Sequence, residues 1–271
     1  MKLKMKRKVS VIIPTYNREH SIEKSIRSVL NQTYPVDEVV IADDCSSDGT
    51  GDMVRSIEDA RIKYYKLPGN RGAGGARNYG VKMAQNELIA FHDSDDMWHP
   101  DKLEKQMKLL ETGEYGLVYG AYRMHLQFGI LHDVPELNGN RKLQGEIYKD
   151  LLVRNSIGAP TILMEKRVFN EIGGFDESMR SLEDWDFALR VAKLYPIGFV
   201  PEVLMEVEST AGGVSSNQAQ YYKSRCYMLR KFRSDYLALG VFETAVLDIL
   251  DKAKQDGIEE QISKMIMLYM Q

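Results

Sequence analysis

One short stretch, Leu88-Ile-Ala-Phe-His-Asp-Ser-Asp-Asp96, sets the expectation for the rest of the chain. Its four leading apolar residues predict a short buried strand, which runs directly into three carboxylates. A strand of a parallel α/β sheet presents functional groups at its carboxyl end, where ligand crevices form. Crowded carboxylates repel one another, so a cation among them would favour this arrangement, and hard oxygen ligands suit Mg²⁺ or Mn²⁺. The alternative is a solvated acidic turn before a helix near Pro100, and both interpretations stay open at this point.

Composition limits the class of protein. The chain has 271 residues, enough for one large α/β domain with or without an appendage, and its net charge of −3 argues against a general nucleic-acid-binding surface. No apolar segment approaches the roughly 18 residues of a membrane span, and no signal peptide is recognisable. Cys45 and Cys226 lie far apart, which is typical of reduced thiols. We therefore expect a cytoplasmic protein, free or at the inner face of the membrane.

Strands and helices are expected to alternate along the first half of the chain. Apolar runs predict strands at 9–13, 38–42, 62–65, 88–91, 116–122 and 197–200. The apolar spacing at 22–30 predicts an amphipathic helix with Asn17 as its N-cap, and 68–75 reads as a flexible glycine-rich loop. This alternation predicts a mostly parallel, Rossmann-like sheet. A long polar loop is expected at 125–145, and helices are expected from about 218 to 270.

A second acidic pair, Asp43 and Asp44, follows the strand predicted at 38–42. Parallel neighbouring strands would place this pair at the same sheet edge as Asp93, Asp95 and Asp96. One acidic cluster can be a helix cap, but two that face one crevice indicate a ligand site. Carboxylates there can accept hydrogen bonds from a base or ribose, and nearby tyrosines can stack on a ring.

Two further motifs have competing interpretations. The run Gly72-Ala-Gly-Gly-Ala-Arg77 is similar to a dinucleotide-binding fingerprint, but Arg77 stands where the third glycine is required and the run is not in the first βα turn. This disfavours an NAD-dependent dehydrogenase, and leaves Arg77 as a pyrophosphate contact or a surface ion pair. The run Glu183-Asp-Trp-Asp186 is either an acidic helix start favoured by the dipole or the source of a general base.

Taken together, these motifs resemble the family 2 glycosyltransferases of the GT-A fold, from Val9 to about Gly213. The matching blocks are Val9-Ser-Val-Ile-Ile-Pro-Thr-Tyr-Asn-Arg18, Val40-Ile-Ala-Asp-Asp-Cys-Ser-Ser-Asp-Gly-Thr50, Asn70-Arg-Gly-Ala-Gly-Gly-Ala-Arg-Asn-Tyr-Gly80, Asp93-Ser-Asp-Asp96, Gly173-Gly-Phe-Asp176 and Glu183-Asp-Trp-Asp186. The resemblance implies a GT-A domain over 1–214, which binds the nucleotide-sugar and carries catalysis, and a C-terminal helical extension over 215–271.

The resemblance also implies roles for individual residues. Asp184 would be the catalytic base, with Glu183 beside it, and Asp95 and Asp96 would hold Mn²⁺ or Mg²⁺. The nucleotide-sugar would be bound by Pro14, Tyr16, Asn17, Asp43, Asp44, Arg77, Asp93 and Asp95. Many relatives carry a further histidine near the end of this domain, but 208–216 contains none.

The implied activity is a metal-dependent, inverting transfer of a hexosyl or N-acetylhexosaminyl group. The donor would be a nucleotide-sugar, with a UDP-sugar expected, and the acceptor a glycan or lipid-linked glycan of a bacterial cell-surface polysaccharide. A sugar-nucleotide or phosphoryl-handling transferase and a non-catalytic nucleotide-sugar-binding module are the alternatives. Because both the Asp95/Asp96 pair and Asp184 are present, the binding module is disfavoured.

The C-terminal helices lie outside the catalytic blocks. Tyr222, Cys226, Leu229 and Phe232 are spaced to pack on the domain or on a second copy in a homodimer. A peripheral membrane contact is the alternative, and it would use Lys223, Arg225, Arg230, Lys231 and Arg233. We favour packing or dimerisation, because the apolar face is not exceptionally strong.

Overall fold

The computed structural model describes residues 6–113, 115–126, 129–137, 139–208 and 217–270. The strands are β1 Val9–Thr15, β2 Glu38–Asp43, β3 Ile62–Lys66, β4 Leu88–Phe91, β5 Met97–Trp98, β6 Leu117–His125, β7 Leu131–Val134, β8 Leu163–Glu165 and β9 Ile197–Glu208. The helices are α1 Ile22–Leu30, α2 Thr50–Ser56, α3 Gly72–Met83, α4 Lys102–Leu110, α5 Tyr148–Val153, the 3₁₀ turn η2 Ala159–Thr161, α6 Lys166–Ile172, α7 Glu183–Ala192, α8 Gln218–Lys231, α9 Arg233–Ala238, α10 Phe242–Gln255 and α11 Glu259–Met270.

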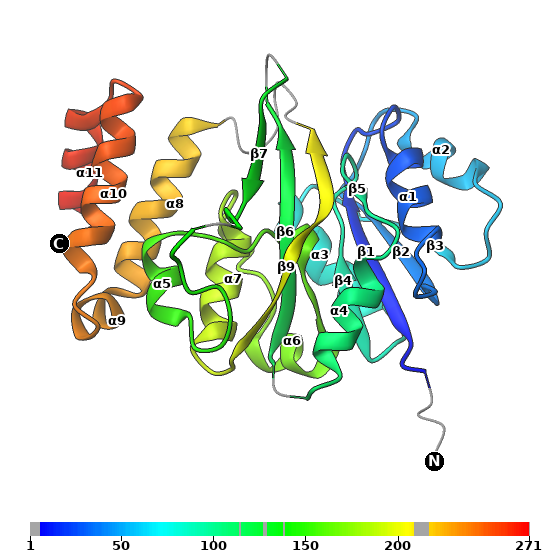
Figure 1. Cartoon of the computed structure of the whole chain (residues 1–271). Coiled ribbons are helices and arrows are strands. Elements are labelled where there is room, and N and C mark those ends of the chain that lie inside the picture. The colour runs from blue at the N-terminus through cyan, green and yellow to red at the C-terminus, as the bar shows by residue number, and fades with distance from the viewer. Residues whose placement is uncertain (1–5, 114, 127–128, 138, 209–216, 271) are drawn as a thin grey trace.

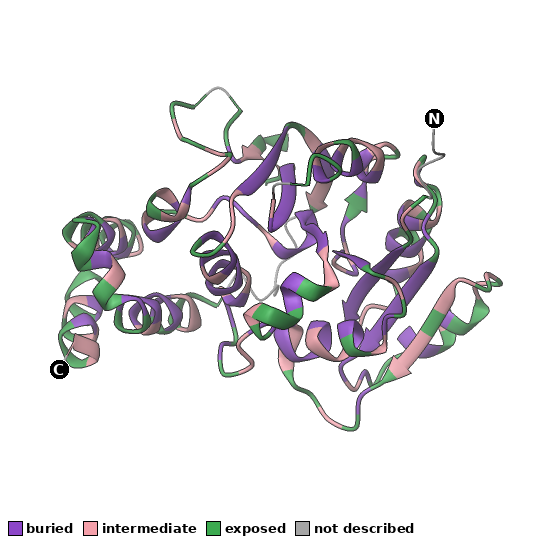
Figure 2. Cartoon of the chain, turned by 90° about the horizontal axis from the view of Figure 1, so that it is seen from below, coloured by how far each residue is buried: buried purple, intermediate pink, exposed green. Residues whose placement is uncertain are grey.

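The strands form one sheet in the order β3-β2-β1-β4-β8-β6-β9-β5, with β7 paired to β6 (Figure 1). Strands β1 to β4 are mutually parallel, whereas β8 runs antiparallel to both β4 and β6, and β9 is parallel to β6. The central strands are buried, and the edge strand β3 is partly exposed (Figure 2). The predicted α/β sheet with a helical C-terminal extension is confirmed.

The side chains of β1 alternate between the two faces of the sheet, and both faces are covered. Successive side chains of a strand point to opposite faces, so Ile12 packs in the cluster that contains Val81 of α3. Val11 and Ile13 pack in the other cluster, together with residues of α1 and α4. A strand buried on both faces has a continuous apolar sequence, which is what 9–13 shows.

The parallel register fixes the position of the site. Ile12 lies opposite Val40 of β2 and opposite Phe91 of β4. The carboxyl ends of β1, β2 and β4 therefore meet at one edge of the sheet. The residues that follow these strands, at 16–18, 44–48 and 92–96, are brought together there.

Two helix starts differ from the sequence-based expectation. Helix α1 is preceded by Ser21 as N-cap, so the prediction that Asn17 caps it is wrong. Helix α3 already begins at Gly72, so Gly72, Gly74 and Gly75 of the predicted flexible loop belong to a helix, whereas Gly69 precedes it. Close packing explains them: a Cβ on Gly74 would lie 3.3 Å from the side chains of Phe175 and Glu183.

Part of the segment 125–145, where a polar loop was predicted, forms regular structure. Strand β6 continues to His125, and β7 pairs with it in antiparallel register, with His125 opposite Leu131. Arg123 Nε also donates to Asp133 Oδ1 at 2.7 Å across the hairpin. The prediction of one continuous loop is therefore wrong for this part of the segment.

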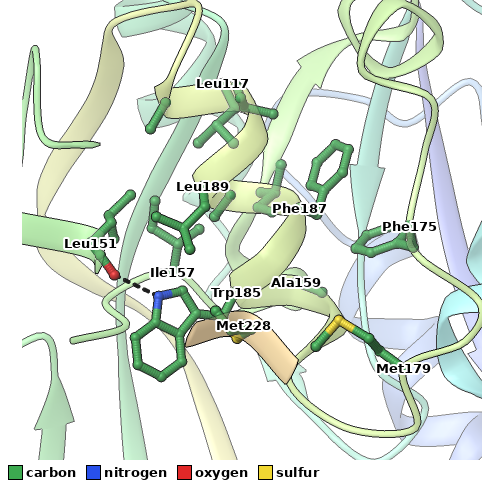
Figure 3. Close-up of a cluster of buried hydrophobic side chains, with 14 of the residues drawn as sticks. Leu117, Leu151, Ile157, Ala159, Phe175, Met179, Trp185, Phe187, Leu189 and Met228 are labelled. Carbon is green, nitrogen blue, oxygen red and sulfur yellow. Dashed lines mark hydrogen bonds between the residues drawn. The ribbon is translucent and has the colours of Figure 1, made fainter. Parts of the chain in front are cut away.

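The C-terminal helices share a core with the sheet. Tyr222, Cys226, Leu229 and Phe232 are all buried in one cluster that extends to the α7 residues. Figure 3 shows Met228 of α8 beside this cluster, with Trp185 Nε1 donating to the carbonyl of Leu151 at 2.6 Å. These apolar positions pack against their own chain. The predicted domain boundary at 214/215 lies outside the described residues.

The basic residues that the alternative, a membrane contact, would use are divided between the surface and the interior. Arg225 is buried and pairs with Asp248, and Lys231 pairs with Asp176 and Asp186. Both of these side chains therefore already form ion pairs within the chain. Among the residues that the structure describes, no helix combines the length and apolar character needed to cross a membrane.

Candidate functional site

The end of β2 contributes two buried carboxylates with different partners. Asp43 accepts a hydrogen bond from the Ser46 N–H at 2.7 Å and another from the Tyr64 hydroxyl. Asp44 accepts from the N–H groups of Arg71 and Gly72, at 2.7 and 2.8 Å. Burial raises the pKa of Asp44, in opposition to these two hydrogen bonds. Asp43 therefore shapes its own loop, and Asp44 ties β2 to the start of α3.

The end of β1 contributes the residues expected to contact a nucleobase. Pro14 is buried in β1 opposite Ala42, and the Tyr16 side chain that follows is 47% exposed. Asn17 has a φ of 52°, and its Oδ1 accepts from the Ser47 N–H at 2.9 Å. Asn17 thus connects the β1 and β2 loops, while the Tyr16 ring stays open to a partner.

The acidic cluster after β4 lies beside these loops. Asp95 pairs with Arg18 Nε at 3.3 Å, whereas no ion pair to Asp96 is found among the described residues. Burial, and then the charges of Asp93 and Asp95, raise the pKa of Asp96 well above its usual range. Burial and then Asp93 also raise the pKa of Asp95. The three carboxylates of this cluster are therefore only partly neutralised by the cations around them, Arg18 and Arg77.

Arg77 joins that cluster to the start of α7. Its Nη2 donates to Asp93 Oδ1 and its Nη1 to Glu183 Oε1, both at 2.7 Å. The side chain is only 4% exposed and its Nε has no hydrogen-bond partner. Burial opposes its charge, but Asp93 and Glu183 outweigh that effect and raise the pKa of Arg77. Of the two interpretations of Arg77, the surface ion pair is wrong, because partners from other elements enclose the guanidinium, and the pyrophosphate contact stays a prediction.

Three carboxylates open helix α7, and each has different partners. Glu183 pairs with Arg77, and the fully buried Asp186 pairs with Arg190 at 2.9 Å and Lys231 at 2.6 Å. Within the described part of the chain, the donors to Asp184 are two backbone N–H groups, of Trp185 at 2.7 Å and Ala159 at 3.4 Å. Burial and then Glu183 raise the pKa of Asp184 to about 7, although Arg77 lowers it. Such a carboxylate can take up and release a proton near neutral pH.

Sequence reasoning missed two residues of this site. Arg18 was quoted in a matching block but was given no role, although it pairs with Asp95. Tyr122 of β6 was not considered at all. Burial, and then the nearby charges of Asp184 and Asp96, raise the pKa of its phenol. Tyr122 therefore lies near both carboxylates, and no local motif around it signals this, because the fold alone brings β6 to the site.

The residues present fit a cation that is shared with a ligand. Among the described residues, no three His, Cys, Asp or Glu side chains are grouped so as to hold a metal ion by themselves. The raised pKa of the buried Asp96, which has no ion pair among the described residues, and that of its half-buried neighbour Asp95, which pairs with Arg18, nevertheless indicate a site that a cation would stabilise. Mg²⁺ is commonly bound by one or two carboxylates and the phosphates of a substrate, so this pair suits that kind of ion.

Comparisons with known proteins identify the family of the chain. The family model described as Glycosyl transferase family 2 matches residues 10–157. TuaG of Bacillus subtilis, a glycosyltransferase named for teichuronic acid biosynthesis, is 33% identical over 82% of this chain and 87% of its own. The UDP-Glc:α-D-GlcNAc-diphosphoundecaprenol β-1,3-glucosyltransferase WfgD of Escherichia coli is 32% identical over 85% of this chain and 88% of its own.

A solved structure with a similar fold is that of the mannosyltransferase PcManGT from Pyrobaculum calidifontis, in complex with GDP-Man and Mn²⁺. The match has a TM-score of 0.67 and 20% sequence identity, and covers 99% of this chain and 82% of that one. At this identity the likeness concerns the fold, and it extends over the C-terminal helices.

Proposed function

The chain belongs to glycosyl transferase family 2, and from that premise we propose that it is an inverting, metal-dependent glycosyltransferase that uses a UDP-sugar and a lipid-linked glycan acceptor. The family and its GT-A fold make it a glycosyltransferase, as the motifs predicted. The choice of UDP is supported by the name of WfgD, although PcManGT binds GDP-Man. We assign donor binding and catalysis to 1–214, with 215–271 as an extension.

The observation that carries the proposal is the position of Arg77 between two carboxylate groups. One guanidinium bonds both Asp93, beside the Asp95/Asp96 pair, and Glu183, beside Asp184. The proposed metal site and the proposed base are therefore separated by little more than one side chain. A sugar transfer needs this proximity, because the leaving diphosphate and the attacking hydroxyl act on the same anomeric carbon.

The nucleotide would lie along the β1 and β2 loops. Tyr16 has an open aromatic face for the base, and Asn17 and Asp43 hold the loops that border it. The oxygens of Asp44 keep lone pairs beyond those used by α3, so Asp44 can accept from a ribose hydroxyl. Pro14 would form the floor under this pocket.

The proposed chemistry is one displacement. Ionised Asp184 takes the proton of the acceptor hydroxyl while that oxygen attacks the anomeric carbon from the face opposite the diphosphate. The bond from carbon to the diphosphate oxygen breaks, and UDP leaves with the electron pair. Asp95 and Asp96 would hold a Mn²⁺ or Mg²⁺ ion, which when bound offsets the charge that develops on the diphosphate. Because this single displacement attacks from the face opposite the leaving group, the configuration at the anomeric carbon inverts.

The test combines a donor screen with product analysis. The full chain is incubated with Mn²⁺, a sugar linked to an alkyl diphosphate, and a panel of UDP- and GDP-sugars, and UDP or GDP release is measured. NMR then reads the anomeric configuration of the product. We expect one UDP-sugar to be used, with inversion and with loss of activity in EDTA. Retention of configuration, or full turnover after exhaustive chelation, would contradict the proposal.

A further inference from the structure

Two adjoining cavities are lined by residues of the α7 start, of α5 and its flanking segments, and of α8 and α10. The larger, of about 490 Å³, is lined by Leu182 and Trp185 of the α7 start and by side chains of α8 and α10. The smaller, of about 310 Å³, lies beside α5 and the start of α10. Arg154 lines both, so the cavities adjoin, and Leu182 and Trp185 in the lining of the larger one flank the proposed base Asp184 in the sequence.

The larger cavity has the character of a carbohydrate site. Arg225 is 2% exposed, lies 4.2 Å over the Trp185 ring and donates to Asp248 Oδ2 at 3.1 Å. Tyr221 adds a second, partly buried ring to the lining. Small-molecule sites commonly combine aromatic surface with a few fixed polar groups. Here those polar groups are held by an ion pair, so they are positioned before a sugar arrives.

The smaller cavity is lined by three cations and one carboxylate, Asp150. Arg141 donates to the Arg154 carbonyl at 2.9 Å and to Ser156 Oγ at 3.2 Å, and no ion pair to it is found in the described part of the chain. Burial and then the Arg154 charge lower the pKa of Arg141. Lys149, also without an ion pair among those residues, adds a further positive charge. Arg154 pairs with Asp248 at 3.5 Å, so Arg141 and Lys149 are the cations without an ion pair that favour an anion here. Guanidinium groups bind phosphate in a planar, bidentate manner.

We propose that these cavities bind the acceptor, with its sugar in the larger cavity beside Trp185 and Tyr221, and its diphosphate on Arg141, Lys149 and Arg154 in the smaller one. This inference rests on the proposed function. WfgD is named for an acceptor in which the sugar is joined directly to a diphosphate, and the two cavities share Arg154, with the α7 residues in the lining of the larger cavity. The arrangement also separates the acceptor diphosphate from the donor diphosphate, whose charges repel.

The primary test measures binding, which does not depend on turnover. An N-acetylhexosamine linked to a short alkyl diphosphate is titrated by calorimetry into the full chain, with UDP and Mn²⁺ filling the donor site. The same sugar as a neutral alkyl glycoside and inorganic pyrophosphate are titrated in parallel. The variants are Lys149→Gln and Arg154→Gln, which change exposed side chains, and Lys82→Gln on α3 is the matched control.

We expect Lys149→Gln and Arg154→Gln each to weaken binding of the diphosphate-linked sugar by tenfold or more, with the neutral glycoside unaffected and Lys82→Gln equal to wild type. Unchanged binding in both variants would overturn the inference, whatever the transfer assay shows. Pyrophosphate that binds as tightly as the sugar-linked probe would overturn the assignment of the larger cavity. The expected binding pattern without any sugar transfer would support the inference and count against the proposed function instead.

Discussion

The hydrogen-bond and ion-pair partners of the three acids at the α7 start determine which of them can serve as the general base. In the part of the chain that the structure describes, Asp184 receives hydrogen bonds from backbone N–H groups alone, whereas Glu183 and Asp186 are neutralised by Arg77, Arg190 and Lys231. We expect Asp184→Asn to bind UDP-sugar and Mn²⁺ normally and to lose transfer by roughly a hundredfold or more. If Asp184 were only a helix cap, the same change would cost about 1 kcal/mol of stability or less and spare catalysis.

The comparison of donor affinity with the rate of transfer to acceptor separates these cases. The isosteric variant Asp186→Asn is the control, because it weakens a buried ion pair at the same helix start and should act on stability. Near-normal transfer by Asp184→Asn would remove Asp184 from the mechanism and direct attention to Glu183.

The pH dependence of transfer follows from the same carboxylate. A general base works in its ionised form, and burial together with Glu183 raises the pKa of Asp184 to about 7. We expect kcat/KM for the acceptor, at saturating donor and Mn²⁺, to fall about tenfold per pH unit below that pKa. A pH-rate profile that stays flat down to pH 5 would contradict the assignment.

At the residue scale, the sequence predicted which acidic side chains form the candidate site, but it did not predict their ion-pair partners. The acids after β2 and β4 and at α7 were recognised because acids that follow apolar strands form a local pattern. Arg77 was expected at a ligand or at the surface, yet it pairs with Glu183, which is 106 positions away. No local pattern contains such a pairing, since it exists only once α3 and α7 pack together.

At the element scale, the ion pairs of Lys231 connect α8 to the α7 start and to the turn before it. Its Nζ lies 2.8 Å from Asp176 and 2.6 Å from Asp186, which is fully buried. We expect Lys231→Met to lower the free energy of unfolding by about 2–3 kcal/mol, less than the loss of a completely buried pair because Asp186 keeps Arg190. Urea unfolding measures this.

Lys223→Met on the same helix is the matched control for that change. Lys223 is exposed, and a surface substitution of this kind usually changes stability by no more than about 0.5 kcal/mol. Equal midpoints for the two variants would show that the ion pairs of Lys231 contribute nothing to the attachment of α8.

Helices and strands with a clear pattern of apolar residues were predicted well, whereas the shortest strands were not. The strand predicted at 9–13 corresponds to β1, but β5 and β8 span only two and three residues, too few to show a period. The strand predicted at 197–200 stops before Pro201, whereas β9 continues to Glu208. A register shift opposite Gly120 accommodates the proline there, which local sequence does not reveal.

At the scale of the whole molecule, the acidic cluster couples folding stability to pH and to ligand. Asp95 and Asp96 have pKa values raised above those of an unfolded chain. A raised acid contributes stability that is present below the unfolded pKa and is lost as pH rises through the folded pKa. At pH 8, ionisation of Asp95 and Asp96 should therefore lower the folding stability of the ligand-free protein, compared with the same protein carrying these two side chains in neutral form.

Two thermal-unfolding results follow from that coupling. At pH 8 we expect Mn²⁺ together with UDP to raise Tm more than either alone, because the ion relieves the Asp95–Asp96 repulsion and binds the phosphates. We expect Asp96→Asn to raise the Tm of the ligand-free protein at pH 8 while abolishing the added effect of Mn²⁺. Asp52→Asn, on the exposed face of α2, is the control and should retain the Mn²⁺ effect. A lower ligand-free Tm for Asp96→Asn, with its response to Mn²⁺ intact, would place the cation elsewhere and leave Asp96 with a packing role.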